Sequence, residues 1–185
     1  MSEANPNTNN VKEDGMRYRR TLVAGGTYFF TVNLQDRSRD LLIQRIDTLR
    51  NAVRLVKRRH PFHIVAWVVL PDHIHAIWTL PSGDADYSTR WSLIKANFSR
   101  AVAHNEPVCA SRQLKGERGI WQRRFWEHQI RDENDLARHV DYVHINPVKH
   151  GYTERAGDWP FSSIHRYIRD GLLAADWACA PGSRV

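Results

Sequence analysis

The sequence predicts an α+β domain of the split βαβ (ferredoxin-like) type, with one antiparallel sheet and helices packed on one face of it. Stretches rich in aromatic and β-branched residues alternate with stretches whose apolar residues recur at helical spacing. Their order is β-α-β-β-α-β-α, which is the split βαβ order. The 185 residues suffice for about one such domain.

The first strand and the first helix follow from composition and spacing. An aromatic and β-branched run after the Gly25–Gly26 turn predicts a strand at Thr27–Leu34. The next apolar residues recur at steps of four and three, which predicts one helix with Leu42, Ile46, Leu49, Val53 and Val56 on a single face.

Two strands and a second helix come next. The near-continuous apolar run His63–Leu70 indicates a buried central strand, and a Pro71–Asp72 turn leads into its hairpin partner His73–Leu80. Ser88 is a plausible N-cap for a helix that carries Trp91, Ile94, Phe98 and Val102.

The last part of the domain combines a loop, a strand and a helix. Residues 104–119 form a long basic loop, and residues 125–130 a fourth strand. Asp132 caps a helix over residues 133–146, which ends at Pro147. Gly151 then lets the chain turn away from the helix. We therefore expect one folded domain at 17–170 between a flexible N-terminal tail, 1–16, and a C-terminal tail, 171–185.

Composition narrows the class of protein. Lys and Arg number 27 against 20 Asp and Glu, for a net charge of +7, which favours an anionic partner and nucleic acid first. The two cysteines, Cys109 and Cys179, form no CxxC, which argues against a disulfide scaffold or a cysteine zinc site. The N-terminus lacks the apolar core of a signal peptide, and no stretch is long and apolar enough for a membrane span. We expect a cytoplasmic protein with no membrane partner.

The basic charge is concentrated in two runs. Residues 37–59 hold eight Lys or Arg against two Asp, which either form the solvated back of the first helix or contact nucleic acid. Residues 112–131 hold six against two Glu, interleaved with Trp121, Phe125 and Trp126. Arginines among aromatics are typical of a groove that tracks a nucleic-acid backbone and stacks its bases, although these aromatics could equally be core.

Two constellations could carry chemistry. His73 and His75 are two apart on a predicted strand, so both imidazoles leave the same face and could share a divalent ion. Such a pair also arises by chance as hydrogen-bonded histidines at a sheet edge. On the last predicted helix, Tyr142 and Asn146 lie one turn apart on one face, although an interfacial tyrosine with its hydroxyl in water is also common.

Taken together, the two constellations resemble the HUH superfamily of single-strand DNA endonucleases, and most closely the REP-associated tyrosine transposases of the IS200-like single-tyrosine class. REP stands for repetitive extragenic palindrome. The resemblance covers about residues 18–169. The matching motifs are YRR at 18–20, GGTYFFTVNL at 25–34, AWVVLPDHIH at 66–75, IWTLP at 77–81, FWEH at 125–128, Arg131, DYVHINPVKHG at 141–151 and DWPFSS at 158–163.

The resemblance implies a mechanism. His73, His75 and Asn146 would hold Mg²⁺ or Mn²⁺, since two imidazoles and an amide oxygen leave positions open for water and a phosphate oxygen. Tyr142 would attack the phosphodiester, leaving a 5′-phosphotyrosine link and a free 3′-OH. Asp72 and His139 are candidates to orient a ligand histidine or the tyrosine.

The resemblance also implies the substrate, which is single-stranded DNA next to a hairpin of the REP type. Expected DNA contacts come from positively charged or polar side chains, namely Arg123, Arg124, Arg131, Lys149 and His150. Palindrome-associated relatives imply a monomer, and related insertion-sequence enzymes leave a homodimer open.

Three alternatives remain beside the transposase. One is a DNA-hairpin binding protein that no longer cleaves, but His73, His75, Tyr142 and Asn146 are all present. Another is a metal-dependent phosphodiesterase in which water attacks and the tyrosine is structural. A relaxase or rolling-circle initiator is disfavoured by the short chain and the lack of a helicase-like domain.

Overall fold

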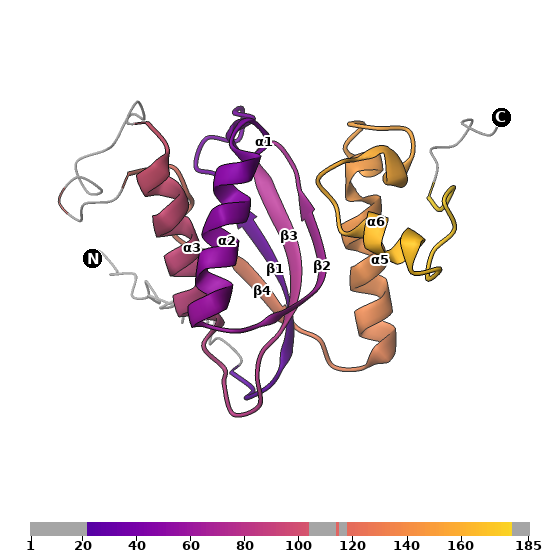
Figure 1. Ribbon diagram of the computed structural model, residues 1–185, viewed down its shortest axis with the longest axis horizontal. Helices are drawn as coiled ribbons and strands as arrows, with labels where there is room; N and C mark the ends of the chain where they lie inside the picture. The colour runs from indigo at the N-terminus through magenta and orange to yellow at the C-terminus, as the bar shows by residue number, and fades with distance from the viewer. Residues whose placement is uncertain (1–21, 104–113, 115–117, 179–185) are drawn as a thin grey trace, which may run out of the picture.

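A four-stranded antiparallel sheet forms the centre of the structure, a computed structural model that describes residues 22–103, 114 and 118–178 (Figure 1). The strand order is β2-β3-β1-β4, with β1 at Thr27–Asn33, β2 at His63–Val69, β3 at His73–Thr79 and β4 at Trp126–Gln129. The predicted α+β class and antiparallel sheet are confirmed. The predicted N-terminal tail and nearly all of the predicted 104–119 loop lie outside the described residues.

The helices cover both faces of this sheet. Their bounds are α1 Leu41–Gln44, α2 Ile46–Arg59, α3 Tyr87–Ala101, α5 Glu133–Lys149, the 3₁₀ turn η1 Ala156–Asp158 and α6 Ile164–Arg169. Figure 1 shows α2 and α3 side by side on one face and α5 on the other. The prediction of helices on one face is therefore wrong. Because β2 is apolar on both sides, each side needs a cover.

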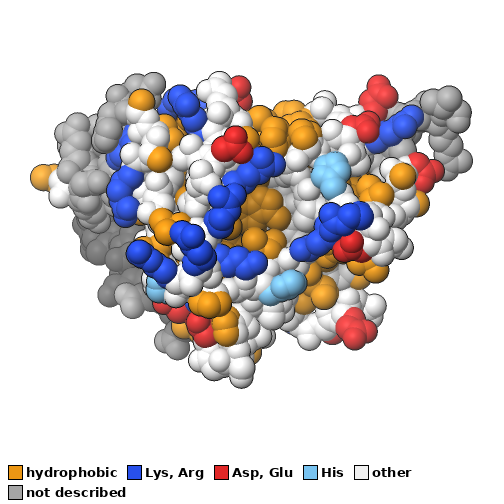
Figure 2. Space-filling view, in the orientation of Figure 1, with side chains coloured by type: hydrophobic (Ala, Val, Ile, Leu, Met, Phe, Trp, Pro, Cys, Tyr) orange, Lys and Arg blue, Asp and Glu red, His pale blue; other side chains and the backbone are white. Residues whose placement is uncertain are grey.

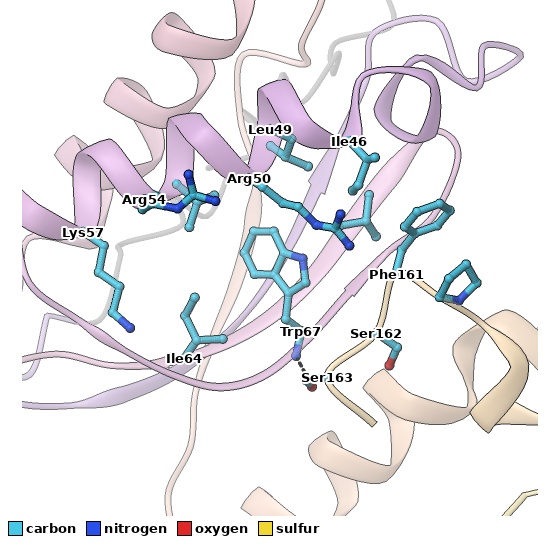
Figure 3. A pocket seen from close by; sticks show the side chains of 13 residues that line it. Ile46, Leu49, Arg50, Arg54, Lys57, Ile64, Trp67, Phe161, Ser162 and Ser163 are labelled. Carbon is cyan, nitrogen blue, oxygen red and sulfur yellow. Dashed lines mark hydrogen bonds between the residues drawn. The ribbon is translucent and has the colours of Figure 1, made fainter. Parts of the chain in front are cut away.

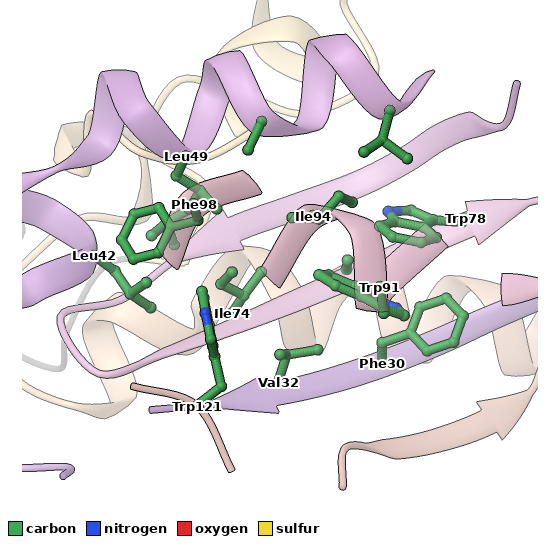
Figure 4. Close-up of a cluster of buried hydrophobic side chains, with 14 of the residues drawn as sticks. Phe30, Val32, Leu42, Leu49, Ile74, Trp78, Trp91, Ile94, Phe98 and Trp121 are labelled. Carbon is green, nitrogen blue, oxygen red and sulfur yellow. The ribbon is translucent and has the colours of Figure 1, made fainter. Parts of the chain in front are cut away.

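Side-chain alternation gives the sheet two different faces. The face under α2 and α3 carries the larger core, in which Phe30, Trp78 and Trp91 pack together, with Trp78 and Trp91 stacked at 4.2 Å between ring centroids (Figure 4). The opposite face carries a smaller apolar cluster of Phe29, Val68 and Ile77, which packs against Val143 of α5. The larger core stabilises the sheet and the two helices above it, and the smaller cluster packs against α5.

The first two predicted helices differ from the structure in their boundaries. Leu42 and Ile46 fall in separate helices, α1 and α2, with Arg45 between them. Asp86, rather than Ser88, caps α3, and its carboxylate accepts a hydrogen bond from the Thr89 backbone N–H at 2.9 Å. This difference is small, because Asp and Ser are equally good N-caps.

The α5 helix starts as predicted and ends later. Asp132 caps it by accepting a hydrogen bond from the Asp135 N–H at 2.8 Å. The helix then continues through Pro147 to Lys149, so the predicted end at Asn146 is wrong. Proline removes only its own N–H from the helix, and the His150 N–H still bonds the Asn146 carbonyl. Gly151, at φ +71°, releases the chain as expected.

The C-terminal part of the chain closes the outer edge of β2. Backbone hydrogen bonds join Val69 N to Phe161 O at 2.9 Å and Ser163 N to Trp67 O at 2.7 Å. Covering an edge strand in this way blocks pairing with another chain. Further along, Trp177 lies 6.3 Å from the His144 ring. Among the described residues, no helix is long and apolar enough to cross a membrane.

A buried arginine ties α3 to the start of β2. Arg90 is 2% exposed, and its guanidinium donates to both carboxylate oxygens of Asp84 and to the His60 and Pro61 carbonyls. The Arg90 guanidinium is the main reason that the pKa of Asp84 lies below its usual value. Removing the Asp84 charge would leave a buried cation without its counter-ion.

We therefore expect Asp84→Asn to lower the free energy of unfolding by about 2 kcal/mol in urea denaturation at neutral pH. Asp86→Asn is the matched control, because an Asn at this position keeps the helix cap. The control should change stability by less than about 0.5 kcal/mol. Equal losses in the two variants would contradict this role of the Arg90–Asp84 pair.

Candidate active site

Strand β3 directs two histidines toward α5. His73 and His75 are 3% and 4% exposed, and their ring centroids are 4.8 Å apart. Ile74, between them, points into the larger core on the other face. The period of two in a strand explains this arrangement, which the sequence predicted.

A partner on Nδ1 fixes the orientation of each imidazole. His73 Nδ1 lies 2.7 Å from Asp72 Oδ1, and His75 Nδ1 lies 2.9 Å from Thr31 Oγ1. Asp72 in turn accepts a hydrogen bond from Arg37 Nε at 2.6 Å. Nε2 thus remains as the atom through which each ring can bind a ligand. The sequence pointed to Asp72 but missed Thr31, which β1 places directly opposite His75.

Burial keeps both rings neutral. Loss of water contact lowers the pKa of His75 to about 3, and it also lowers the pKa of His73, although Asp72 opposes that shift. Burial raises the pKa of Asp72, but hydrogen bonds from His73 and Arg37 bring it below its usual value. A neutral imidazole beside a carboxylate is the usual form of a metal-binding histidine.

The α5 helix brings the tyrosine to these rings and carries the asparagine one turn later. The Tyr142 ring is 5.1 Å from the His75 ring and 37% exposed. Asn146, one turn later, is 1% exposed, and its Oδ1 has no hydrogen-bond partner among the described residues. Lys149 Nζ lies 4.9 Å from the Tyr142 ring centroid, and the His150 ring is 5.3 Å from that of His73.

This donor set suits a hard divalent cation. A buried amide oxygen without a partner costs about 1–3 kcal/mol, and a bound cation would satisfy it. His73, His75 and Asn146 offer two nitrogens and one oxygen, which leave positions open for water and a phosphate oxygen. Such an incomplete shell fits Mg²⁺ or Mn²⁺ better than a closed tetrahedral zinc site.

A second group of metal-binding residue types lies beside this site. The ligand atoms of His128, Asp135 and His139 are all within 4.8 Å of one another. The Asp135 carboxylate hydrogen-bonds His128 Nε2 at 2.8 Å and lies 3.1 Å from His139 Nδ1, which hydrogen-bonds the Asp135 backbone carbonyl at 2.8 Å. A metal would have to replace these bonds. The i, i+4 spacing of Asp135 and His139 was visible in the sequence, but His128 comes from β4, so only the fold completes the group.

Phe29 links the two groups and was not singled out from the sequence. Its ring centroid lies 5.4 Å from His75, 5.8 Å from Tyr142 and 5.0 Å from His139. The structure thus places His139 against Phe29 and Asp135. A cavity of about 530 Å³ opens beside Tyr142, lined by Phe29, Thr31, Trp126, Asp135, Arg138, His139 and Tyr142. It offers room for a substrate next to the phenol.

The predicted DNA-contact residues fall in different places. Lys149 and His150 belong to the site just described. Arg131 is exposed immediately before α5, where its backbone N–H bonds Asp135 Oδ2 at 3.1 Å. Arg123 lines a hollow with α3 residues, and Arg124 next to it is exposed. The structure therefore does not gather all five into one surface.

Comparison with known proteins gives close relatives. A REP-associated tyrosine transposase of Escherichia coli is 51% identical over 161 residues, which are 87% of this chain and 90% of that protein. A Haemophilus influenzae protein with the same family name is 44% identical over 169 residues, 91% of this chain and 96% of its own. The structure of a REP-associated tyrosine transposase bound to a REP hairpin matches with a TM-score of 0.76 and 50% identity, over 87% of this chain and 90% of that one. No protein-family model matches.

The unpartnered oxygen of Asn146 leads to a stability prediction. Asn146→Leu should raise the free energy of unfolding of the metal-free protein by about 1 kcal/mol, because it removes a buried acceptor without opening a cavity. It should also reduce the rise in Tm that Mn²⁺ produces. Asn134→Leu, at an exposed position of α5, is the matched control and should change neither quantity. A less stable metal-free Asn146→Leu protein would contradict the prediction.

Proposed function

The chain belongs to the REP-associated tyrosine transposase family, and on that premise we propose that it is a metal-dependent endonuclease and strand-transferase for single-stranded DNA beside REP-type hairpins. The observation that supports the proposal is the contact of Tyr142 with His75, at 5.1 Å between ring centroids, one helical turn before Asn146, whose Oδ1 has no partner in the described part of the chain. A relative bound to a REP hairpin, with 50% identity, supports the choice of substrate.

Tyr142 is the proposed nucleophile. Its phenolic oxygen attacks the phosphorus, the bond from phosphorus to the 3′ oxygen breaks, and the DNA 5′ end remains attached to the tyrosine. The phenol loses a proton and the departing 3′ oxygen gains one, so the step is balanced. Because the new link is a phosphodiester, another 3′-OH can attack it and rejoin DNA without ATP.

The proposed metal ligands are His73, His75 and Asn146. A bound Mg²⁺ or Mn²⁺ supplies Lewis-acid polarisation of the scissile phosphate. Asp72 and Thr31 hold the two imidazoles through Nδ1, which leaves both Nε2 atoms to bind the metal. Lys149, over the Tyr142 ring, can contact a phosphate oxygen.

We propose that one chain suffices for this chemistry. Tyr142 approaches His75 of the same chain, so no tyrosine helix from a second copy is needed to complete the site. This supports a monomer. We place the activity in the cytoplasm, where its proposed DNA substrate is found.

The nucleophile is tested with labelled single-stranded hairpin DNA and Mn²⁺ on a denaturing gel. The wild type should form a covalent protein–DNA adduct, and Tyr142→Phe should form about a thousandfold less or none while its DNA affinity stays within about twofold. Tyr152→Phe, at another exposed tyrosine close by, is the control and should keep the adduct. Cleavage without an adduct would indicate attack by water, and binding without cleavage would indicate a hairpin-binding protein.

The metal position is tested by comparing the two histidine groups. His73→Gln should abolish cleavage and most of the Mn²⁺-induced rise in Tm, because it removes a proposed ligand. His128→Gln should keep both, because we assign His128 to the hydrogen-bonded group around Asp135. The reverse result would move the metal to that second group. Cleavage that is indifferent to a chelator would contradict a metal at either place.

A further inference from the structure

A groove with a basic rim lies on the α2 side of the sheet, away from the candidate active site. Arg50, Arg54 and Lys57, at helical steps of four and three along α2, line one side of it. Apolar side chains that include Trp67 and Phe161 line the rest, and the cavity measures about 390 Å³. Figure 3 shows these side chains facing one another, and Figure 2 shows the basic groups around an apolar hollow. We call this feature the α2 groove.

A row of aromatic rings runs from the active site to the α2 groove. The centroid of His150 lies 5.3 Å from His73 and 5.8 Å from Tyr152, and Trp159 lies 5.5 Å beyond Tyr152. Phe161, which lines the groove, is 5.6 Å from Trp159. We call the four rings His150, Tyr152, Trp159 and Phe161 the ring row.

The ring row is anchored to β2 at Trp159 and Phe161 and is partly open to solvent. Trp159 Nε1 donates to the Val69 carbonyl at 2.9 Å, and Val69 N–H bonds the Phe161 carbonyl. Tyr152 is 42% exposed, His150 is exposed, and Trp159 and Phe161 are half-buried. Fixed rings with accessible surface can stack on unpaired bases with little loss of entropy.

The rim cations are available to a ligand. Arg50 makes one ion pair, 3.2 Å, with Asp47, whose side chain is 86% exposed. Arg54 donates to the Asn51 side chain at 2.7 Å, and Lys57 is exposed. Exposed pairs of this kind are weak, so a phosphate can replace them. The Arg50 guanidinium also lies 6.0 Å from the Phe161 ring centroid, so a cation lies at the point where the ring row reaches the groove.

We propose that the ring row and the α2 groove bind an unpaired strand of the DNA substrate that flanks the cleavage site. The inference rests on the proposed function and extends it. Bases stack on the exposed parts of the ring row, and their phosphates are neutralised by Arg50, Arg54 and Lys57. A row of rings that leads to a basic rim fits a single strand, because a duplex keeps its base faces stacked inside.

The test measures affinity by fluorescence anisotropy for two hairpins, one with a flank of about ten unpaired nucleotides and one with about two. Arg50→Glu/Arg54→Glu should bind the long-flank hairpin at least about tenfold more weakly than wild type, with a salt dependence reduced by about one to two phosphate contacts. Its affinity for the short-flank hairpin should stay within about twofold. Tyr152→Ala should show the same selectivity, with a loss of about tenfold.

Arg58→Glu/Arg59→Glu is the matched control. It changes the charge of α2 by the same amount at exposed positions that do not line the groove, so it should retain most of the affinity for the long flank. If both double variants lose the same affinity for the long-flank hairpin, the loss reflects only the overall charge of α2, and the inference is overturned. A loss of short-flank affinity equal to the long-flank loss would also overturn it, because the groove would then contact the hairpin.

The outcome separates the inference from the proposed function. Arg50→Glu/Arg54→Glu should still form the Tyr142 adduct with the short-flank hairpin, because these residues lie outside the active site. If the wild type forms no adduct, the proposed function fails, whatever the flank dependence. If the adduct forms and affinity does not depend on the flank, only the further inference fails.

Discussion

The antiparallel pairing of β1 with β3 is the constraint on which the rest of the structure depends. In its register Thr31 lies opposite His75 and Val32 opposite Ile74, so polar and apolar residues separate onto opposite faces. A shift of one residue would bring the histidines into the aromatic core and Ile74 into the active site. Because Val32 and Ile74 are fully buried under α2 and α3, such a shift is heavily penalised. The core therefore fixes the geometry of the site on the other face.

Because the core lies on one face of the sheet and the candidate site on the other, the protein can bury polar groups such as His75 and Asn146 beneath α5. The pKa of His75 is lowered to about 3 by burial, and Asn146 Oδ1 is buried without a partner among the described residues. The buried oxygen without a partner is a cost in the free protein, and both groups fit a site that a cation would complete. The smaller apolar cluster around Phe29 and Val143 would be a weak anchor for α5 alone. Stability comes instead from the larger core, in which Trp78, Trp91 and Phe30 contact one another.

The sequence predicted the elements of this fold better than their arrangement. Strand alternation revealed that His73 and His75 share one face of the sheet, and helical spacing revealed that Tyr142 and Asn146 share one face of a helix. Spacing does not say which face a helix covers, so the position of α5 opposite α2 and α3 was missed. The prediction that Pro147 ends the helix failed, because packing of the buried Pro147 inside α5 offsets the one hydrogen bond that proline cannot make. Phe29, Thr31 and the His128–Asp135–His139 group join residues from separate strands and helices, and no pattern along the chain marks such contacts.

The segment from Trp159 to Ser163 joins the two sides of the molecule. It must lie along β2, since an uncovered edge strand would be open to pairing with other chains, and its backbone supplies that cover. Once its backbone is fixed there, its side chains have few directions left. Trp159 packs toward Tyr152 on the α5 side, whereas Phe161 turns toward Arg50 on the α2 side. A structural need thus places aromatic rings between the Tyr142 side of the sheet and the basic helix α2. A DNA strand that followed them would pass around the sheet edge without requiring any part of the fold to move.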